Sequence, residues 1–432
     1  MSDYQNIPFW HTKVETIEAK TETLIKTVDI AIVGGGFTGL ATALHLLRAG
    51  KSVAIFDAMK IGQGASGKNG GMVGPSLHKL GLQGLTNTYG REKALNILQE
   101  GMTAIEYFQK FIKEEEIDCD LKMTGRFRGV TDKKALEGVM RDSEELLTLK
   151  GFKYDIVKEE NVQDEIGSTL YKGGVVYHQD GGLHPFKLQT SLLKKVLELG
   201  GKIYEETKVG DIVKTPNGFN IDTEKGQLVS DQVVIASNAY TKRFGGSHTS
   251  WFYKRLLPIT SAMIATEELP KETINRMFPK KRMHGGNHRL VQYYRASPDH
   301  KRVLFGARGS DPHDRSLVNG KNLKTHLCKI FPELEKTTID YSWCGKVAYT
   351  FDHTPHLGIQ DGLYYAIGYC GSGVTRSIYL ARQLSRKMLG LDDHQTAFDD
   401  LGYKSKPFYT GTPWFMPTVL KWHSFLDRIE GN

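Results

Sequence analysis

Residues 28–57 read VDIAIVGGGFTGLATALHLLRAGKSVAIFD, and this stretch decides the fold of the chain. Its first six residues are mostly β-branched and apolar, which predicts a buried strand. Apolar residues then recur at Leu40, Ala43, Leu44 and Leu47, the spacing of one helix face. Residues 52–56 are strand-like again, so the stretch is one complete strand–helix–strand unit.

The turn between the first strand and the helix carries the pattern G-x-G-x-x-G at Gly34, Gly36 and Gly39. Gly34 permits the tight turn, Gly36 lets a pyrophosphate approach the backbone, and Gly39 lets helix and strand pack closely. The helix N-terminus offers free N–H groups to phosphates. Asp57 follows about 20 residues later, where a carboxylate accepts hydrogen bonds from an adenosine ribose. The stretch therefore predicts a dinucleotide-binding domain.

A second glycine-rich loop, residues 61–71 (IGQGASGKNGG), follows Asp57 almost at once. With the first motif it resembles the FAD-dependent D-amino-acid oxidase superfamily, in which such a loop runs beside the flavin. The subgroup it is most similar to includes glycine oxidase, sarcosine oxidase and γ-glutamylputrescine oxidase. The resemblance covers most of residues 28–390, including Trp343-Cys344-Gly345 and the strand, glycine turn and helix start at residues 362–375.

We expect an α/β fold in which an FAD-binding, Rossmann-like domain of the GR2/DAO type is interleaved with an α+β substrate domain built on a mostly antiparallel sheet. Strand patterns lie at 202–205, 209–214, 218–222, 227–237, 255–266, 288–295 and 301–308, and helical patterns at 87–150 and 186–199. The expected domains are an N-terminal extension (1–27), the FAD-binding domain (28–85, 155–245 and 345–395), the substrate domain (86–154 and 246–344) and a C-terminal tail with an aromatic amphipathic helix (396–432).

The motifs and the resemblance together imply a set of FAD-contacting residues. They are Gly34, Gly36, Phe37, Thr38, Gly39, Asp57, Ala65, Ser66, Asn69, Gly70, Gly71, Met72, Val209, Ser237, Asn238, Gly371, Ser372, Gly373, Val374 and Thr375. The helix start after Gly371 also directs N–H groups at the flavin pyrimidine ring, where reduced flavin develops negative charge.

This chain departs from the resembled enzymes at the substrate. The arginine that grips a substrate carboxylate in glycine oxidase-like members corresponds to Val347, and the lysine of sarcosine oxidase-like members corresponds to Thr375. The positions of covalent flavin attachment correspond to Val347 and Lys68, which favours noncovalent FAD. The catalytic residues are unknown, with Lys68, Lys346 and Tyr294 as candidates. Alternation along a strand sends Tyr293 and Tyr294 to opposite faces, so only one of them lines a pocket.

Composition excludes several classes of protein. The chain has 432 residues, 39% of them hydrophobic, and no run of about 18 apolar residues, so we expect two or three domains and no membrane-spanning helix. Four widely spaced cysteines and an N-terminus without an apolar core predict a cytoplasmic protein without disulfides or a metal site. A net charge of +8 spread along the chain predicts a solvated basic surface and no nucleic-acid partner.

The tail pattern TVLKWHSFLDRI, residues 418–429, is amphipathic. One short helix with few basic residues binds membranes weakly, so we expect it to dock on the protein's own surface.

The resemblance implies an oxidoreductase that passes a hydride from the C–N bond of a primary or secondary amine or amino acid to the flavin and is reoxidised by O2. Two alternatives stay open at this point. One is a D-amino-acid or 2-hydroxy-acid dehydrogenase that feeds a quinone, and the other is a flavin-binding protein without turnover.

Overall fold

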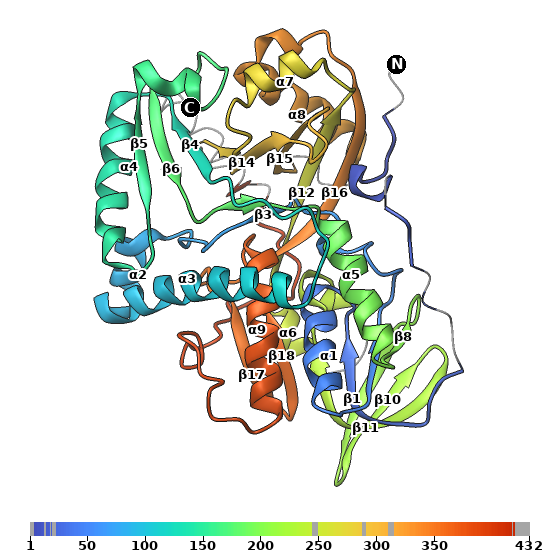
Figure 1. Ribbon diagram of the computed structural model, residues 1–432. Coiled ribbons are helices and arrows are strands. Elements are labelled where there is room, and N and C mark those ends of the chain that lie inside the picture. Colours follow the sequence, from blue (N-terminus) through green and yellow to red (C-terminus); the bar gives the residue numbers. More distant parts are fainter. Residues whose placement is uncertain are drawn as a thin grey trace.

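The computed structural model describes residues 4–12, 14–17, 19, 23–243, 249–286, 291–309, 315–416 and 418–419. Within these residues two eight-stranded sheets and one two-stranded sheet organise the chain. Figure 1 shows the first sheet and its helices in the lower half and the second sheet in the upper half. The predicted α/β fold with an interleaved α+β part is confirmed.

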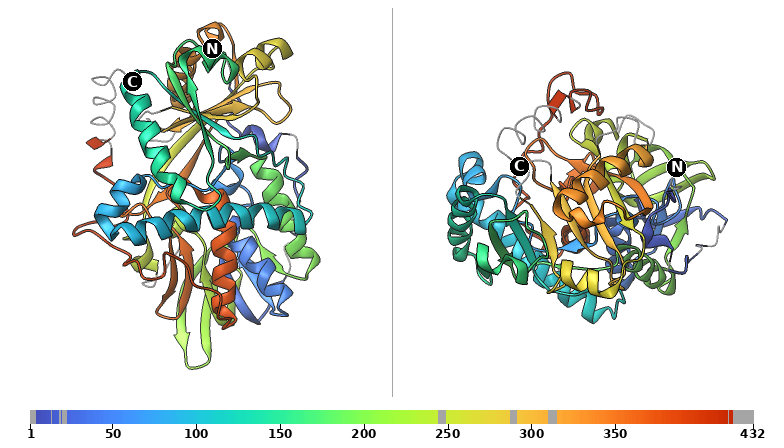
Figure 2. Two further views of the ribbon diagram at one scale, coloured as in Figure 1. Left: turned by 60° about the vertical axis from the view of Figure 1, so that its left-hand side comes forward. Right: turned by 90° about the horizontal axis from the view of Figure 1, so that it is seen from above.

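The first sheet has the order β17-β18-β11-β1-β2-β8. Its strands are β1 (Thr27–Val33), β2 (Val53–Phe56), β8 (Lys202–Tyr204), β11 (Gly226–Ile235), β17 (His356–Gln360) and β18 (Leu363–Ile367). The pairings from β8 to β18 are all parallel, and β17 adds an antiparallel edge. Two further strands, β9 (Val209–Thr215) and β10 (Gly218–Thr223), pair antiparallel and lead into β11. These strands project from the bottom of the molecule in Figure 1 and in the left view of Figure 2.

Helices α1 (Phe37–Arg48) and α9 (Gly373–Met388) pack on this sheet, while α5 (Pro185–Glu198) packs against α1 and α3 (Arg91–Glu114) against α9. Their apolar faces share one core, in which Leu40, Leu44, Leu192 and Ile378 are fully buried. The parallel strands are buried on both faces, which explains the continuous apolar run of β1. The ends of these strands and the helix starts that follow them therefore hold a fixed arrangement.

The second sheet has the order β16-β12-β15-β14-β13-β4-β6-β5 and is antiparallel except between β13 and β4. Its strands are β4 (Arg126–Val130), β5 (Tyr154–Lys158), β6 (Gly173–Tyr177), β12 (Leu257–Thr266), β13 (Met283–Gly285), β14 (Gln292–Ala296), β15 (Val303–Arg308) and β16 (Ile339–Tyr349). Helix α8 (Ser316–Ile330) contacts β12 and β16, and α4 (Lys133–Glu145) contacts β6. The remaining elements include α2 (Gly81–Tyr89), α6 (Ser250–Tyr253), α7 (Lys271–Met277) and the pair β3 (Met72–Val73) and β7 (Gly181–Gly182).

The structure differs from the sequence prediction in three places. Residues 87–150, predicted as helical, also contain strand β4, and β5 and β6 lie in the second sheet although residues 155–245 were expected in the FAD-binding domain. Strand β16 crosses the expected boundary between residues 344 and 345. Pairing between distant segments determined the sheet to which β4, β5 and β6 belong, because a strand of five residues carries too little periodicity to indicate the strand with which it pairs.

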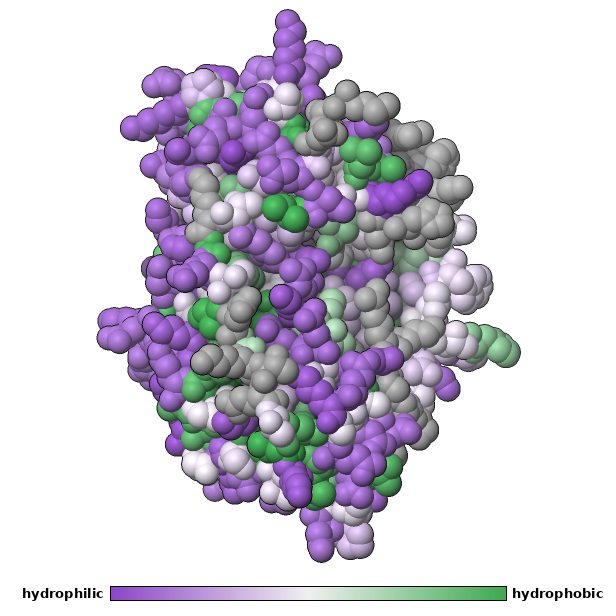
Figure 3. Space-filling view, turned by 90° about the vertical axis from the view of Figure 1, so that its right-hand side faces the viewer, coloured by the Kyte–Doolittle hydropathy of each residue, from purple (hydrophilic) through white to green (hydrophobic). Residues whose placement is uncertain are grey.

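The N-terminal residues run down one side of the molecule, from the second sheet to the start of β1 (Figure 1). The predicted strand 288–295 is described only from residue 291 onward, and there it forms β14. The helix predicted in the tail lies almost wholly outside the described residues. In the part of the chain that the structure describes, no helix has the length and apolar character needed to cross a membrane. Figure 3 shows hydrophilic side chains over most of one face, with apolar residues in small separate groups.

Candidate active site

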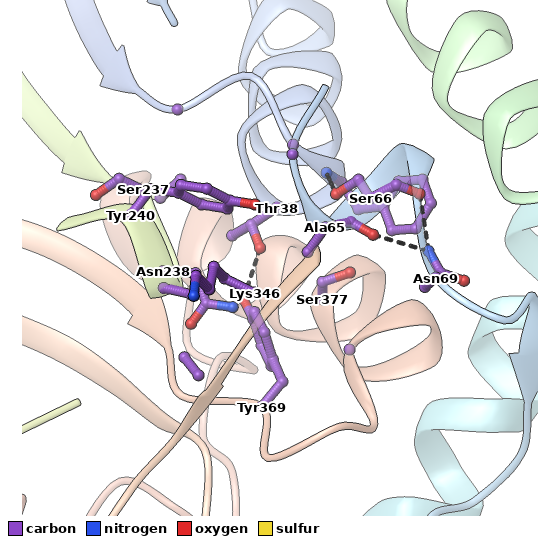
Figure 4. Close-up of a pocket in the computed structure, with 18 of the residues that line it drawn as sticks. Thr38, Ala65, Ser66, Asn69, Ser237, Asn238, Tyr240, Lys346, Tyr369 and Ser377 are labelled. Carbon is purple, nitrogen blue, oxygen red and sulfur yellow. Dashed lines mark hydrogen bonds between the residues drawn. The ribbon is translucent and has the colours of Figure 1, made fainter. Parts of the chain in front are cut away.

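A pocket with an empty volume of about 990 Å³, part of it open to solvent, lies where β1, β11 and β18 of the first sheet end. It is lined by the turn before α1, by the 61–71 loop, by residues 236–240, by β16 and by the start of α9. Figure 4 shows side chains from these elements around one cavity. The carboxyl ends of parallel strands are the usual place for a nucleotide in such a fold.

The turn before α1 is shaped by its glycines. Gly34 has a φ of +110°, and a Cβ there would lie 2.8 Å from the backbone of Ala236. A Cβ on Gly39 would collide with the carbonyl oxygen of Gly34. Gly36 is the N-cap of α1 and provides no side-chain cap, so the first turn of the helix keeps N–H groups for a ligand, apart from that of Phe37, which donates to the Ser66 hydroxyl. The local geometry matches the phosphate-binding role predicted from the sequence.

Asp57 lines the pocket at the end of β2. Its carboxylate accepts hydrogen bonds from the backbone N–H groups of Gly35 (2.8 Å) and Met59 (2.9 Å). Burial raises the pKa of this carboxyl, and the two donors oppose the rise. Gln189 of α5 donates to the carbonyl of Gly35 at 2.6 Å, while its own Oε1 is buried without a partner. An unpartnered acceptor in the pocket wall fits a ligand that brings hydrogen-bond donors, as the hydroxyl groups of FAD do.

The 61–71 loop is organised by Asn69. Its Nδ2 donates to the carbonyls of Ala65 (3.2 Å) and Ser66 (2.8 Å), and its Oδ1 accepts from the N–H of Gly71 (2.8 Å). The Ser66 hydroxyl in turn accepts from the N–H of Phe37 at 2.9 Å, which joins the loop to α1. Figure 4 shows the bonds of Asn69 to Ala65 and Ser66 as dashed lines.

Two tryptophans hold the same loop from outside the first sheet. Trp10, from the N-terminal segment, donates its indole N–H to the carbonyl of Asn69, and Trp343, from β16, donates to the carbonyl of Lys68, both at 2.8 Å. His11 also contacts the carbonyl of Gly67 at 3.2 Å. Trp10 and Trp343 are buried in one apolar cluster, so the loop is fastened to the second sheet and to the N-terminal segment together.

The opposite wall is formed by the start of α9. Ser372 is the N-cap and its side chain makes no capping bond, so this helix also directs free N–H groups at the pocket. The hydroxyl groups of Tyr369 and Thr38 lie 2.7 Å apart and join this wall to α1 (Figure 4). Asn238 accepts a hydrogen bond from the N–H of Gly368 at 2.9 Å, which joins the segment after β11 to the same turn.

Most of the residues predicted to contact FAD line this pocket: Gly34, Gly36, Phe37, Thr38, Asp57, Ala65, Ser66, Asn69, Ser237, Asn238, Gly371, Gly373 and Val374. The others, Gly39, Gly70, Gly71, Met72, Val209, Ser372 and Thr375, do not line it. Gly39 supports the pocket through helix packing, and Val209 lies buried in β9. The contacts of this second group with FAD stay a prediction.

Sequence reasoning missed several residues that line the pocket, among them Gln189, Tyr240, Tyr369 and Ser377. Tyr369 lies in the segment 362–375 that carries the resemblance, and Tyr240 follows the predicted strand 227–237, but neither pattern indicates which of these side chains face the pocket. The one available signal was a glutamine on the buried face of the helix predicted at 186–199. In the structure Gln189 is fully buried.

The three catalytic candidates have different positions. Lys346 lines the pocket, and its Nζ donates to the Thr260 hydroxyl at 2.7 Å. Lys68 is half-buried beside Gly345, and burial lowers the pKa of its ammonium group. The structure contradicts the prediction of Tyr294 as a catalytic candidate. This residue is buried in the core of the second sheet, where its hydroxyl lies 2.6 Å from that of Tyr171.

The neighbour of Tyr294 faces the loop instead. The ring of Tyr293 packs against Gly70, and its hydroxyl lies 2.9 Å from that of Ser261. Burial raises the pKa of Tyr293 to about 12, so its hydroxyl stays protonated. Alternation predicted one tyrosine on each face, and the packing decided which face carries the site.

Comparison with known proteins agrees with this geometry. The model of the DAO family, described as FAD dependent oxidoreductase, matches residues 29–387. A γ-glutamylputrescine oxidoreductase of Escherichia coli is 31% identical over 413 residues, which is 93% of each chain. A probable oxidoreductase OrdL of Haemophilus influenzae is 30% identical and covers 88% of this chain and 87% of its own.

Among solved structures, glycine oxidase from Geobacillus kaustophilus superposes with a TM-score of 0.73 at 20% identity, covering 89% of this chain and 99% of its own. At that identity the likeness shows the fold. The family match over most of the chain and the two relatives agree with the nucleotide pocket built from β1, α1 and the 61–71 loop. The chain therefore belongs to the DAO family of FAD-dependent oxidoreductases, and FAD is its cofactor.

Proposed function

We propose that this enzyme oxidises the C–N bond of a primary or secondary amine, amino acids included, to an imine, with O2 as electron acceptor. One observation carries the proposal: Lys346, Val347 and Ala348 line the FAD pocket, while their strand β16 pairs with β12 in the second sheet. A substrate held by the second sheet thus lies against the cofactor. The names of the relatives, γ-glutamylputrescine oxidoreductase and glycine oxidase, support a nitrogen-bearing substrate.

When bound, FAD accepts the hydride that leaves the substrate carbon. The chain's own task is to present the amine in its neutral form, because a protonated nitrogen has no lone pair to support the developing imine. Lys346 is held at the pocket wall by Thr260, and Lys68 lies nearby on the 61–71 loop. Positive charges near the substrate nitrogen disfavour its protonation and lower its pKa. Water then hydrolyses the released imine without a protein nucleophile.

Noncovalent attachment of FAD is supported by the composition of the pocket. None of the described residues that line it is a histidine or a cysteine. Val347 and Lys68 stand where resembled enzymes attach flavin covalently, and neither side chain forms those bonds. We therefore expect FAD to leave the protein on mild denaturation.

We also propose two points about organisation. The FAD-binding domain keeps residues 28–85 and the parallel strands, while residues 154–177 belong with the substrate domain because β5 and β6 pair there. A cytoplasmic location suits Cys119, Cys328, Cys344 and Cys370, which are free thiols, because a reducing compartment keeps thiols in this state.

The test is an anaerobic absorbance titration of the purified yellow protein with a panel of polyamines, N-methyl amino acids, D-amino acids and 2-hydroxy acids, followed by air. Bleaching by one amine and hydrogen peroxide on reoxidation are expected. Bleaching by 2-hydroxy acids alone, or reoxidation by a quinone but not by O2, refutes the proposal in favour of a dehydrogenase. A flavin that no panel member bleaches refutes turnover of these substrates altogether.

A further inference from the structure

A buried loop, residues 350–356, packs against the turn that joins β18 to α9. This turn, residues 368–371, contributes Gly371 to the wall of the FAD pocket. Gly368, Cys370 and Gly371 have positive φ values of 80°, 54° and 93°. Cys370 is not a glycine, and such a residue persists in this conformation only where the surrounding structure holds it. The loop supplies part of that structure.

Thr350 is the contact between the loop and the turn. It is fully buried, its hydroxyl lies 3.3 Å from the Cys370 Sγ, and a Cβ on Gly368 would lie 2.5 Å from its methyl group. The hydroxyl donates to the carbonyl of Thr354 at 2.8 Å, which fixes its direction. The N–H of Cys370 donates to the carbonyl of Ala348, just before the loop, at 3.0 Å. The position of Thr350 therefore constrains the turn.

A buried carboxylate and an imidazole close the loop. The oxygens of Asp352 lie 3.0 and 3.1 Å from the His356 Nε2, and one of them accepts the N–H of Thr354 at 3.2 Å. Both side chains are at most 4% exposed. Burial raises the pKa of Asp352, but His356 and Thr354 outweigh it and lower the pKa to about 2. The His356 ring also stacks on Tyr403 of the C-terminal segment, with centroids 4.1 Å apart. Asp352 and His356 thus hold Thr354, whose carbonyl receives the bond from Thr350.

We propose that Asp352 and His356 are positioning residues that act through Thr350 and hold the 368–371 turn where it presents the start of α9 to FAD. Ser372 follows the turn as the N-cap of α9, and its side chain leaves the first N–H groups of the helix uncapped. These groups and the helix dipole favour negative charge. Reduction adds electrons to FAD, so a turn held in place favours the reduced cofactor and raises its reduction potential. This role concerns the cofactor and is independent of the substrate that the enzyme oxidises.

The test is the reduction potential of the FAD-bound enzyme, measured without substrate by stepwise reduction with dithionite in the presence of a reference dye. Thr350→Val keeps the methyl group and the neutral charge of the side chain but removes the hydroxyl. We expect a shift of about tenfold or more towards oxidised FAD, which is a potential more negative by about 30 mV for a two-electron couple. Thr350→Ser, which keeps the hydroxyl, is expected to stay close to the wild-type potential.

Asp352→Asn tests the pair itself. Loss of the carboxylate charge alone favours the reduced cofactor and makes the potential more positive, whereas loss of the turn's position makes it more negative. The sign therefore separates the two roles, and we expect the more negative potential. Adding Thr350→Val to Asp352→Asn is expected to change little, because both act through one contact. His178→Gln is the matched control, since it disrupts an exposed histidine–aspartate pair with Asp155.

Three results overturn the proposal. One is a Thr350→Val enzyme whose potential does not become more negative while the melting temperatures of its apo and FAD-bound forms fall equally, because the loop then serves general stability. The second is an equal shift in Thr350→Ser, because the hydroxyl then plays no part. The third is an unchanged or more positive potential in Asp352→Asn. If that variant does not fold, Asp352→Glu, which keeps the charge and displaces the carboxylate, takes its place with the same expected sign and the same refuting result.

Discussion

Replacing Trp10 with phenylalanine tests whether the N-terminal segment holds the loop that contacts FAD. The Trp10 side chain is fully buried, and its indole N–H is the donor to the carbonyl of Asn69. Asn69 in turn binds Ala65, Ser66 and Gly71 through its side chain, so a shift of its backbone disturbs the whole pocket wall. Phenylalanine keeps most of the apolar packing and removes the donor.

The expected magnitude follows from the lost bond. A buried carbonyl left without its donor costs about 1–3 kcal/mol. If the ordered loop is the form that binds FAD, this cost weakens the affinity for FAD by a factor of about 5–150, at 1.4 kcal/mol for each tenfold change. Trp343→Phe removes the donor to the adjacent carbonyl of Lys68 and is expected to act in the same direction. The double variant is expected to be non-additive, because both bonds hold one loop.

The assay is the dissociation constant of FAD, measured from flavin fluorescence during reconstitution of the apoprotein, with melting temperatures of the apo and FAD-bound forms beside it. Trp414→Phe is the matched control, since Trp414 is 71% exposed. The reasoning is refuted if Trp10→Phe lowers both melting temperatures equally and leaves the affinity for FAD within twofold of the wild type. That result would assign Trp10 to general stability.

Three further predictions concern the glycine turn before α1, the core of the second sheet and the pH dependence of stability. Gly39→Ala places a methyl group against the carbonyl oxygen of Gly34, and we expect a loss of about 3 kcal/mol in stability and of bound FAD, measured by denaturant unfolding and flavin content. Tyr294→Phe leaves the Tyr171 hydroxyl without its partner and is expected to cost about 1–3 kcal/mol with kcat unchanged; a large fall in kcat at unchanged stability would contradict its assignment to the core. Burial lowers the pKa of His11 to about 4, so the unfolded chain takes up a proton before the folded one, and this contribution to stability is lost as the pH falls from about 6.5 towards 4. His11→Gln is expected to show a smaller drop in melting temperature over that range, and an unchanged drop would show that His11 does not titrate in this way.

The nucleotide-binding unit was predictable because its requirements are local. At Gly34, Gly36 and Gly39 the turn or a close approach of neighbouring atoms leaves no room for a Cβ, and these requirements arise within short segments. The alternation and turn signals of residues 202–235 also lie within short segments, and β8 to β11 follow them closely. In contrast, β4 was missed because its five residues lie between helices rich in glutamate and lysine. Nothing in so short a segment indicates the neighbour with which it pairs.

The sequence by itself determined the strand–helix–strand unit, the glycine turn and a dinucleotide as the kind of cofactor, since these depend on backbone conformation and on spacing along one segment. The assignment of that dinucleotide as FAD came from the resemblance to a known family. Only the tertiary structure decided that Tyr293 faces the 61–71 loop while Tyr294 lies in the core. It also decided that Trp10 and Trp343 hold adjacent carbonyls, and that Thr350 joins the loop of Asp352 and His356 to the turn before α9. Periodicity indicates that a strand has two faces, but burial against distant elements determines which face lies toward the site. Contacts between distant elements arise only when the sheets are assembled.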